Sequence, residues 1–143
     1  MGKIFIPGNV PSLKNSKIKT DKGIFPSKTV VKYLRSLGIK SYSSSKKIIT
    51  IYRKYPYKFG PIVEPMRQEL KTAKRPHVVM FHFVRDSKRK FDFINAVQII
   101  ADLLVAADII LDDDMDNFIP YPWRRVGQWY SYDKDKPGVW LEY

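Results

Sequence analysis

The residues with the clearest chemical potential are four carboxylates in the heptapeptide LDDDMDN, residues 111–117. Carboxylates this close repel one another, so the cluster lowers stability unless a cation relieves the repulsion. Solvent counterions, lysines elsewhere in the chain and a bound metal ion are the three alternatives. A calcium loop of the EF-hand type is excluded, because Asn117 stands where that loop requires glycine and Trp123 stands at its twelfth position.

A strongly apolar helix is predicted directly before this acidic turn, over residues 93–107. Most of its circumference is apolar, which is typical of a buried helix. Asn95, Gln98 and Asp102 nevertheless recur at spacings of three and four, so they form one polar stripe. Asp92 precedes the helix, where a carboxylate either caps free backbone amides or serves as a ligand. The pattern leaves both roles of Asp92 open, and the stripe is either solvated or functional.

The expected lengths of two elements bring the helix start and the acidic turn together. The helix advances about 17 Å from residue 95 to residue 106. A short strand predicted at residues 109–111, continued to residue 113, returns roughly 13–17 Å. We therefore expect the acidic turn beside Asp92 and beside the basic turn RDSKRK, residues 85–90. Carboxylates gathered there suit Mg²⁺ or Mn²⁺, which would activate water against a phosphodiester. A solvated acidic turn that pairs with the basic half is the alternative.

The charge of the chain is large and unevenly distributed. The formal net charge is +12, and residues 1–90 carry 22 Lys and Arg against 4 Asp and Glu, whereas residues 91–143 carry 4 against 10. A basic excess of this size predicts attraction to a polyanion. Aromatic residues interleave with the cations between positions 33 and 59, a combination that favours nucleic acid. A basic protein without such a partner is the alternative, and an anionic membrane is disfavoured because no long basic amphipathic helix is predicted.

Length and composition indicate one α+β domain over residues 1–143, with a mixed β-sheet packed against helices. The absence of cysteine excludes disulfides, and the apolar run at residues 94–111 is interrupted by polar side chains and cannot span a membrane. We expect a soluble, cytoplasmic protein without a secretory signal. The predicted strands cover residues 3–6 and 77–84, the latter central, and the predicted helices cover residues 28–37, capped by Ser27 and ended by Gly38, and residues 65–71.

Four further segments complete the prediction of local structure. Residues 9–23 are predicted to be a basic loop and residues 41–47 a serine-rich loop. Residues 48–52 fit either a strand or a helix. The tail is predicted to form a hairpin in which QWYSY and GVWLEY flank the turn DKDKPG.

The run KFDFINAVQIIADLLVAADIILDD resembles the RusA family of Holliday junction resolvases of bacteria and their phages. The family pattern is Asp-x-Asp-Asn, a Lys three residues on, an Asp four beyond it, and a pair of acids about ten later. Without a gap, the matching residues are Asp92, Asn95, Asp102, Asp112 and Asp113. The segments RDSKRK, IPGNVPSLKNSK and GVWLEY resemble the basic turn, opening strand with its loop, and last strand of the family, whereas residues 40–74 are little covered.

The resemblance implies a homodimer with a mixed α+β fold that cleaves branched DNA with Mg²⁺ or Mn²⁺. Two positions depart from the family pattern: Ile94 replaces its second Asp and Gln98 replaces its Lys. The first departure removes a presumed metal ligand, and the second removes a cation thought to assist catalysis. A non-catalytic, structure-selective DNA-binding protein that keeps the fold is therefore the alternative, and flaps or forks are alternative substrates.

These patterns give three sets of candidate site residues. The candidate catalytic residues are Asp92, Asn95, Asp112 and Asp113. The candidate metal ligands are Asp92, Asp112, Asp113 and Asp114. The candidate DNA-binding residues are Lys14, Lys17, Arg85, Lys88, Arg89 and Lys90, with Arg124 and Arg125 as secondary candidates.

Overall fold

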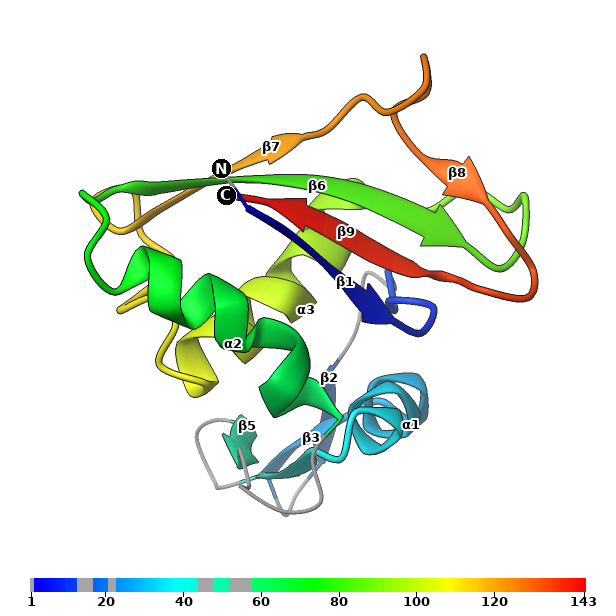
Figure 1. Cartoon of the computed structure of the whole chain (residues 1–143). Helices are drawn as coiled ribbons and strands as arrows, with labels where there is room; N and C mark the ends of the chain where they lie inside the picture. Colours follow the sequence, from blue (N-terminus) through cyan, green and yellow to red (C-terminus); the bar gives the residue numbers. More distant parts are fainter. Residues whose placement is uncertain (1, 13–16, 21–22, 44–47, 52–57) are drawn as a thin grey trace.

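The β-branched and aromatic run HVVMFHFVR forms the central strand β6 (His77–Arg85) of a mixed sheet. The structure is a computed structural model that describes residues 2–12, 17–20, 23–43, 48–51 and 58–143. On one side of β6 lies β9 (Gly138–Glu142), antiparallel, followed by β1 (Lys3–Pro7), also antiparallel. On the other side β7 (Phe118–Pro122) and β8 (Ser131–Tyr132) both pair with β6 in parallel, as Figure 1 shows.

Two helices cover one face of this sheet, α2 (Phe59–Leu70) and α3 (Phe93–Ala106) (Figure 1). Alternate residues of β6, Val79, Phe81 and Phe83, point into the core beneath them and are buried. The alternation follows from the two-residue period of a strand. The two helices also contact each other through Arg67 of α2, whose guanidinium donates to the carbonyl of Ala107 at the end of α3.

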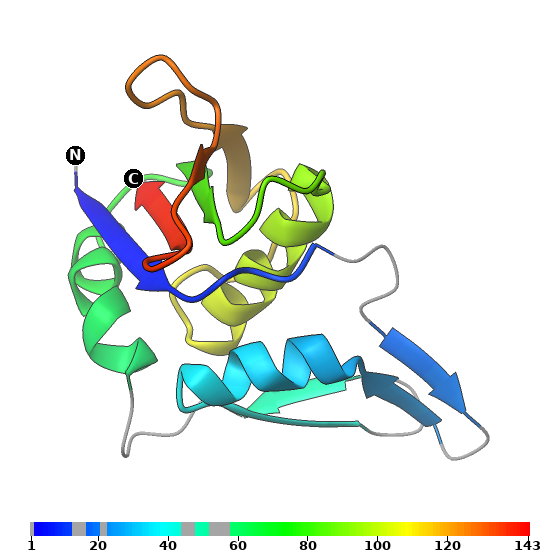
Figure 2. The same cartoon turned by 90° about the vertical axis from the view of Figure 1, so that its right-hand side faces the viewer.

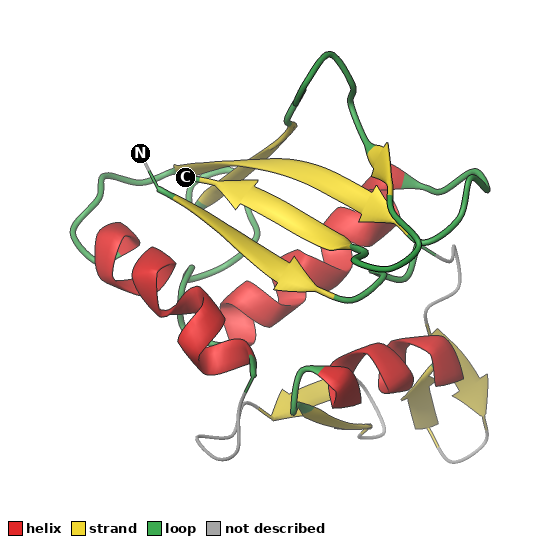
Figure 3. Cartoon of the chain, turned by 45° about the vertical axis from the view of Figure 1, so that its right-hand side comes forward, coloured by secondary structure: helices red, strands yellow, loops and turns green. Residues whose placement is uncertain are grey.

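A smaller layer lies beyond these helices, away from the main sheet (Figures 2 and 3). It consists of α1 (Lys28–Ser36) and two hairpins, β2 (Lys17–Thr20) with β3 (Gly23–Pro26) and β4 (Lys40–Ser43) with β5 (Ile48–Ile51). Ser27 caps α1 by accepting a hydrogen bond from the amide of Val30 at 3.3 Å, and Gly38 adopts a φ of 75° just after the helix. Both features were predicted, because serine satisfies free amides and glycine tolerates a positive φ.

Most predicted elements are confirmed, and residues 48–51 prove to be a strand. Two loop predictions are wrong, and one predicted helix is longer than expected. The predicted basic loop at residues 9–23 contains β2, and β4, which begins at Lys40, extends to Ser43 within the predicted serine-rich loop. The predicted helix at residues 65–71 is confirmed as the second half of α2, which begins six residues earlier than predicted, at Phe59. Pro65 lies inside α2 on its exposed side, so water can serve the backbone group that proline leaves without a partner.

The remaining errors concern strand pairing after α3. No strand forms at residues 109–111, and the strand that follows α3 is β7, which begins only after the acidic turn. The predicted C-terminal hairpin is also wrong, because β8 and β9 do not pair with each other but lie on opposite sides of β6. The turn between them is nonetheless built as expected, with Asp133 accepting from the amides of Asp135 and Lys136.

The predicted α+β class with a mixed sheet is thus confirmed. Among the described residues, no helix is long and apolar enough to cross a membrane.

Candidate functional site

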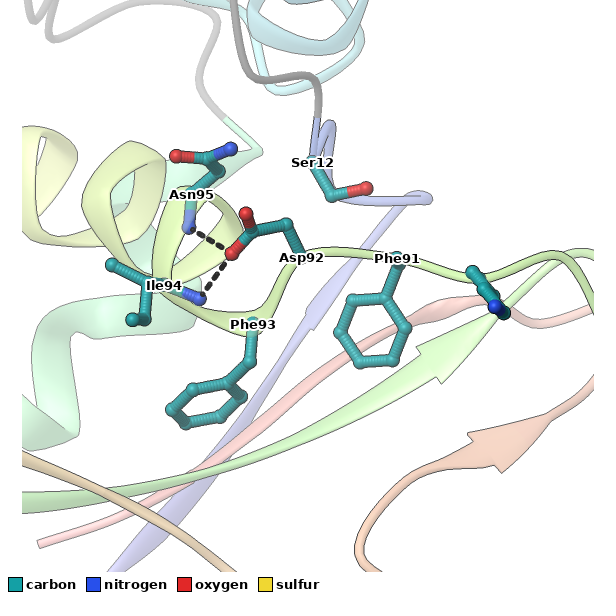
Figure 4. Close-up of a pocket in the computed structure, with 7 residues that line it drawn as sticks. Ser12, Phe91, Asp92, Phe93, Ile94 and Asn95 are labelled. Atoms are coloured by element: carbon teal, nitrogen blue, oxygen red, sulfur yellow. Dashed lines mark hydrogen bonds between the residues drawn. The ribbon is translucent and has the colours of Figure 1, made fainter.

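Asp92 sits at the start of α3 and holds the end of the helix. Its Oδ1 accepts hydrogen bonds from the amides of Ile94 at 3.0 Å and Asn95 at 3.3 Å (Figure 4). Asp92 is therefore an N-cap, and its negative charge suits the positive end of the helix dipole. The second carboxylate oxygen takes no part in these two bonds, so capping and a role toward a ligand are compatible.

A surface pocket opens beside this carboxylate. Its lining residues come from the N-terminal loop and from the start of α3, namely Ser12, Lys90, Phe91, Asp92, Phe93, Ile94 and Asn95. The side-chain nitrogen of Asn95 is buried and finds no acceptor within the described part of the chain. A buried amide without an acceptor is costly, and an oxygen of a bound ligand would satisfy it once the side chain turned toward the pocket.

The acidic turn meets α3 through Gln98. The side-chain nitrogen of Gln98 donates to Oδ1 of Asp102 at 2.8 Å and to Oδ2 of Asp113 at 2.9 Å. A primary amide has two hydrogens to donate, so Gln98 commits both of them to carboxylates. From the sequence, Gln98 was assigned to the polar stripe and to the loss of a family cation, but its contact with the acidic turn was not predicted. The structure instead makes it the group that fastens the acidic turn to the polar stripe.

Within the acidic turn, the other carboxylates bond mainly to their own backbone. Oδ1 of Asp112 accepts from the amide of Asp113 at 2.8 Å. Oδ1 of Asp114 accepts from the amide of Asp116 at 3.1 Å and from the side chain of Asn117 at 2.8 Å. All four acids of the turn are exposed, and in the described part of the chain none forms an ion pair. Lysine relief of the turn is therefore not built into the described fold.

The acidic turn was predicted to lie beside Asp92, but it contacts α3 further along the helix. Asp113 meets α3 at Gln98, six residues beyond Asp92 and so about 9 Å further along a helix axis. Over the described ranges, no three acidic or histidine side chains group closely enough to hold a metal ion together, so the predicted ligands Asp92, Asp112, Asp113 and Asp114 do not form one site. The physical reason is that residues 109–111 bend instead of extending as a strand.

The described side chains could hold a divalent ion only with two carboxylates, and the other ligands would come from substrate and water. Mg²⁺ is often held by one or two carboxylates together with substrate phosphates and water. Asp102 and Asp113 supply such a pair, because both reach the same side-chain nitrogen of Gln98. Rotation of that amide would present its oxygen, which is a further ligand type that Mg²⁺ accepts. The fit therefore needs a substrate phosphate to complete the coordination.

The basic turn at residues 85–90 contains one buried cation, Arg85 at the end of β6, and three exposed cations. Arg85 is buried, donates to the carbonyl of Val10 and lies 4.7 Å from the ring centroid of Phe91. Burial lowers the pKa of Arg85 from its ordinary value, although its guanidinium stays charged at neutral pH. Arg85 thus holds the N-terminal loop, and its role in phosphate binding stays a prediction. The exposed cations are Lys88, Arg89 and Lys90.

The other predicted DNA-binding residues lie elsewhere. Lys14 is outside the described residues, and Lys17 begins β2, where only the backbone is described. Arg124 and Arg125 belong to the connection between β7 and β8, where each stacks on tryptophan: Arg124 on Trp129 and Arg125 on Trp123. The aromatic partners of these arginines were missed, although the dense spacing of Trp and Tyr in residues 121–132 was a visible signal.

No family model, curated protein or solved structure matched this chain when it was compared with each.

Proposed function

We propose that the chain is a divalent-metal-dependent endonuclease that binds and cleaves branched DNA, with a RusA-like fold and Holliday junctions as the first substrate to test. The observation that carries the proposal is the contact of Gln98 with Asp102 and Asp113, because it brings the acidic turn onto the polar stripe of α3. That helix begins at Asp92, directly after the exposed cations of the basic turn, Lys88, Arg89 and Lys90. Carboxylates next to phosphate-binding cations suit metal-assisted phosphodiester hydrolysis.

In this proposal Asp102 and Asp113 are the first candidate ligands of Mg²⁺ or Mn²⁺, joined by the substrate phosphate. Asp92, Asp112 and Asp114 remain further candidates. When bound, the ion supplies a coordinated water of lowered pKa and a positive charge at the scissile phosphate. The protein positions the carboxylates. The hydrogen bonds accepted by Asp92 fix the start of α3, and the hydrogen bond from Gln98 to Asp113 fixes the acidic turn against α3.

The pocket beside Asp92 supports the placement of a phosphate. Lys90 lines the same pocket and contributes a positive charge, and the buried nitrogen of Asn95 contributes a donor that lacks an acceptor within the described residues. A phosphate oxygen would partly neutralise the lysine, and it would satisfy the Asn95 donor after rotation of that side chain toward the pocket. The charge of Asp92 repels a phosphate, so a phosphate beside Asp92 would need a divalent ion shared between the two.

A homodimer and an intracellular setting belong to the same proposal. The branch of a four-way junction is roughly two-fold symmetric, so a two-fold dimer would present equivalent sites to opposed strands. Large apolar side chains stay exposed at the helix start and the acidic turn, where Ile94 is 76%, Leu111 69% and Met115 72% exposed. Such exposed side chains favour a contact between subunits. A DNA substrate, together with the resemblance to the RusA family, supports the cytoplasm of a bacterial cell or of a phage-infected host as the setting.

A second candidate is a non-catalytic DNA-binding protein with the same fold. It is favoured by the contact that also carries the first proposal: a neutral amide, and not a cation, lies between Asp102 and Asp113. With Ile94 exposed and unable to bind a metal, the acidic groups could serve only to shape the turn.

Incubation with a labelled four-way junction, with and without Mg²⁺ or Mn²⁺, separates the two candidates. The endonuclease proposal expects cleavage that requires the metal, and loss of cleavage but not of junction binding in Asp113→Asn. Junction binding without cleavage at millimolar Mn²⁺ would favour the second candidate. Absence of binding at low salt would contradict both.

A further inference from the structure

The connection between β7 and β8 leaves the edge of the sheet and projects from it (Figures 1 and 2). We call residues 124–130 the arm. At one end of the arm the amide of Trp123 donates to the carbonyl of Phe81 at 2.7 Å, and at the other end Ser131 pairs with Val84 of β6. The chain is therefore tied to β6 on both sides of the arm, while the arm itself has no strand partner in β6.

Buried His82 fixes both ends of the arm at once. Its Nδ1 lies 2.9 Å from the carbonyl oxygen of Trp123, and its Nε2 lies 2.6 Å from Oγ of Ser131. A carbonyl can only accept, so Nδ1 carries the hydrogen and Nε2 accepts from the serine hydroxyl. His82, on the central strand, thus anchors both the start and the end of the arm, so the arm has a fixed position relative to the sheet.

The tip of the arm is a tight turn. Arg125 and Gln128 exchange two backbone hydrogen bonds, at 2.8 and 2.9 Å, around Val126 and Gly127. The guanidinium of Arg125 folds back between two rings, 4.9 Å from the centroid of Trp123 and 4.2 Å from that of Trp140. These cation–π contacts hold the turn against the sheet face that the helices leave uncovered.

Aromatic rings remain exposed along the arm and just after it. We call Trp129, Tyr130 and Tyr132 the aromatic patch; they are 57%, 49% and 47% exposed. Cations cover two of these rings, with Arg124 at 5.7 Å from the centroid of Trp129 and Lys88 at 5.5 Å from that of Tyr132. Residues 118–132 contain two arginines and no acidic residue. Exposed aromatics gathered with cations mark a surface for a partner that is both flat and anionic.

The patch continues into the candidate site. Tyr130 packs edge-to-face on Phe91, with ring centroids 5.1 Å apart. Phe91 lines the pocket that contains Lys90 and Asp92. Aromatic and basic side chains therefore follow one another from the aromatic patch to the start of α3, and a DNA strand bound to the patch could follow them.

We infer that the aromatic patch binds unpaired nucleotides of one DNA strand and directs that strand into the pocket beside Asp92. Bases in a duplex are stacked on each other and offer no free face, whereas unpaired bases stack on Trp and Tyr and their phosphates attract nearby Arg and Lys. The inference rests on the proposed function and specifies its substrate class: a branched DNA with a single-stranded arm, such as a flap or a fork, in preference to a fully paired junction.

Fluorescence anisotropy with a labelled oligothymidylate and with a blunt duplex of equal length tests the patch, in buffer containing EDTA so that no cleavage occurs. Trp129→Leu keeps an apolar side chain but removes the ring, and Trp129→Phe restores a ring at the same position. We expect Trp129→Leu to weaken oligothymidylate binding by at least about 5-fold, Trp129→Phe to recover most of it, and neither to change duplex binding materially. Tyr132→Leu and Tyr132→Phe provide the same comparison at a second ring.

Equal loss of oligothymidylate and duplex binding in Trp129→Leu, or no loss at all, would overturn the inference, as would failure of the phenylalanine variant to recover binding. Metal-dependent cleavage is measured separately, on a four-way junction and on a flap. A parent protein that cleaves while Trp129→Leu leaves flap cleavage and oligothymidylate binding unchanged overturns the patch and keeps the endonuclease. A parent protein that never cleaves, but loses oligothymidylate binding in Trp129→Leu alone, overturns the endonuclease and supports strand binding by the patch.

Discussion

The side-chain amide of Gln98 donates to a carboxylate oxygen of Asp113 across 2.9 Å, fastening the acidic turn to α3. The same nitrogen also reaches Asp102. Two like charges are thus held near each other by a neutral donor. The site thus consists of a helix start that Asp92 caps and an acidic turn that Gln98 joins to the polar stripe.

Removal of this donor should loosen the turn, and a cation in its place should tighten it. Gln98→Ala loses both hydrogen bonds and is expected to lower the free energy of unfolding by less than about 1.5 kcal/mol, because the groups are exposed and water replaces the amide. Gln98→Lys places an ammonium between two carboxylates and should be at least as stable as the parent at low salt. Denaturant unfolding at low and high salt measures both. A Gln98→Lys variant as unstable as Gln98→Ala would contradict the assigned contact.

Two histidines make stability depend on pH. Burial lowers the pKa of both His82 and His77. The hydrogen bond to the Trp123 carbonyl opposes this lowering of the His82 pKa, whereas the charges of Arg125 and Arg75 lower the pKa of His82 and His77 further, respectively. The unfolded chain therefore binds protons more readily than the folded one. Stability should be full above about pH 6.5 and fall as the pH decreases below it, by at most about 1.4 kcal/mol per pH unit for each histidine.

Denaturant midpoints measured across this range check the direction. His77→Asn and His82→Asn serve as comparisons, because each removes one titrating group and should flatten the dependence near pH 6. A stability that rises as the pH falls from 6.5 would contradict the lowered pKa values.

Val126 holds a backbone conformation that a β-branched residue rarely adopts. Its φ is 48° and its side chain is 99% exposed, so no packing compensates for the conformation. The turn that it forms with Gly127 is of the kind in which Asn-Gly is preferred. Val126→Asn should therefore raise the free energy of unfolding by about 1 kcal/mol. Thermal unfolding of the variant checks this, and a lower melting temperature would show that Val126 makes contacts beyond the turn.

The ends of two helices show what the sequence could and could not reveal. Both α1 and α3 end in the same pattern, in which the second residue past the C-cap bonds back five residues: Ile39 to Leu34, and Ile109 to Leu104. The residue between needs a positive φ, which glycine provides at Gly38 and aspartate provides at residue 108, with φ of 75° and 57°. A glycine just after a helix is a recognisable sign of this helix end in a sequence, whereas an aspartate is not. The apolar pair after residue 108 was therefore interpreted as a strand.

Non-local pairing explains the other errors. The turn between β8 and β9 has the residues of a hairpin, but both strands pair with β6, which is more than forty positions away in sequence. Local patterns carry no information on that choice. Asp92 as a cap and the polar stripe of α3 could be predicted, since both depend on spacing along one helix. The role of Gln98 could not, because it depends on where the acidic turn returns.

The exposed lysines of the basic turn should contribute to DNA binding through phosphate contacts. Lys90→Ala is expected to weaken binding of the junction and of a plain duplex alike and to reduce the slope of log affinity against log salt by about 1. Lys71→Ala removes one exposed lysine just past α2 and serves as the matched control, with a smaller effect expected. A Lys90→Ala variant with parental affinity and salt slope would remove this turn from the binding surface.

Asp92 offers the sharpest separation of folding from chemistry, because two substitutions remove its charge but only one removes its cap. Asparagine caps helices as well as aspartate does, so Asp92→Asn should keep both bonds to the amides of Ile94 and Asn95. Alanine cannot cap, and Asp92→Ala should lower the free energy of unfolding by about 1 kcal/mol.

If Asp92 also acts on the phosphate or its ion, both variants should lose metal-dependent cleavage, although only one is destabilised. Junction affinity should be kept or slightly increased in both, since a negative charge facing phosphate is gone. The measurements are thermal unfolding, junction binding without metal, and cleavage with Mn²⁺. Parental cleavage by Asp92→Asn together with a destabilised Asp92→Ala would reduce Asp92 to a cap and move the search for the reacting group to Asp113 and Asp102.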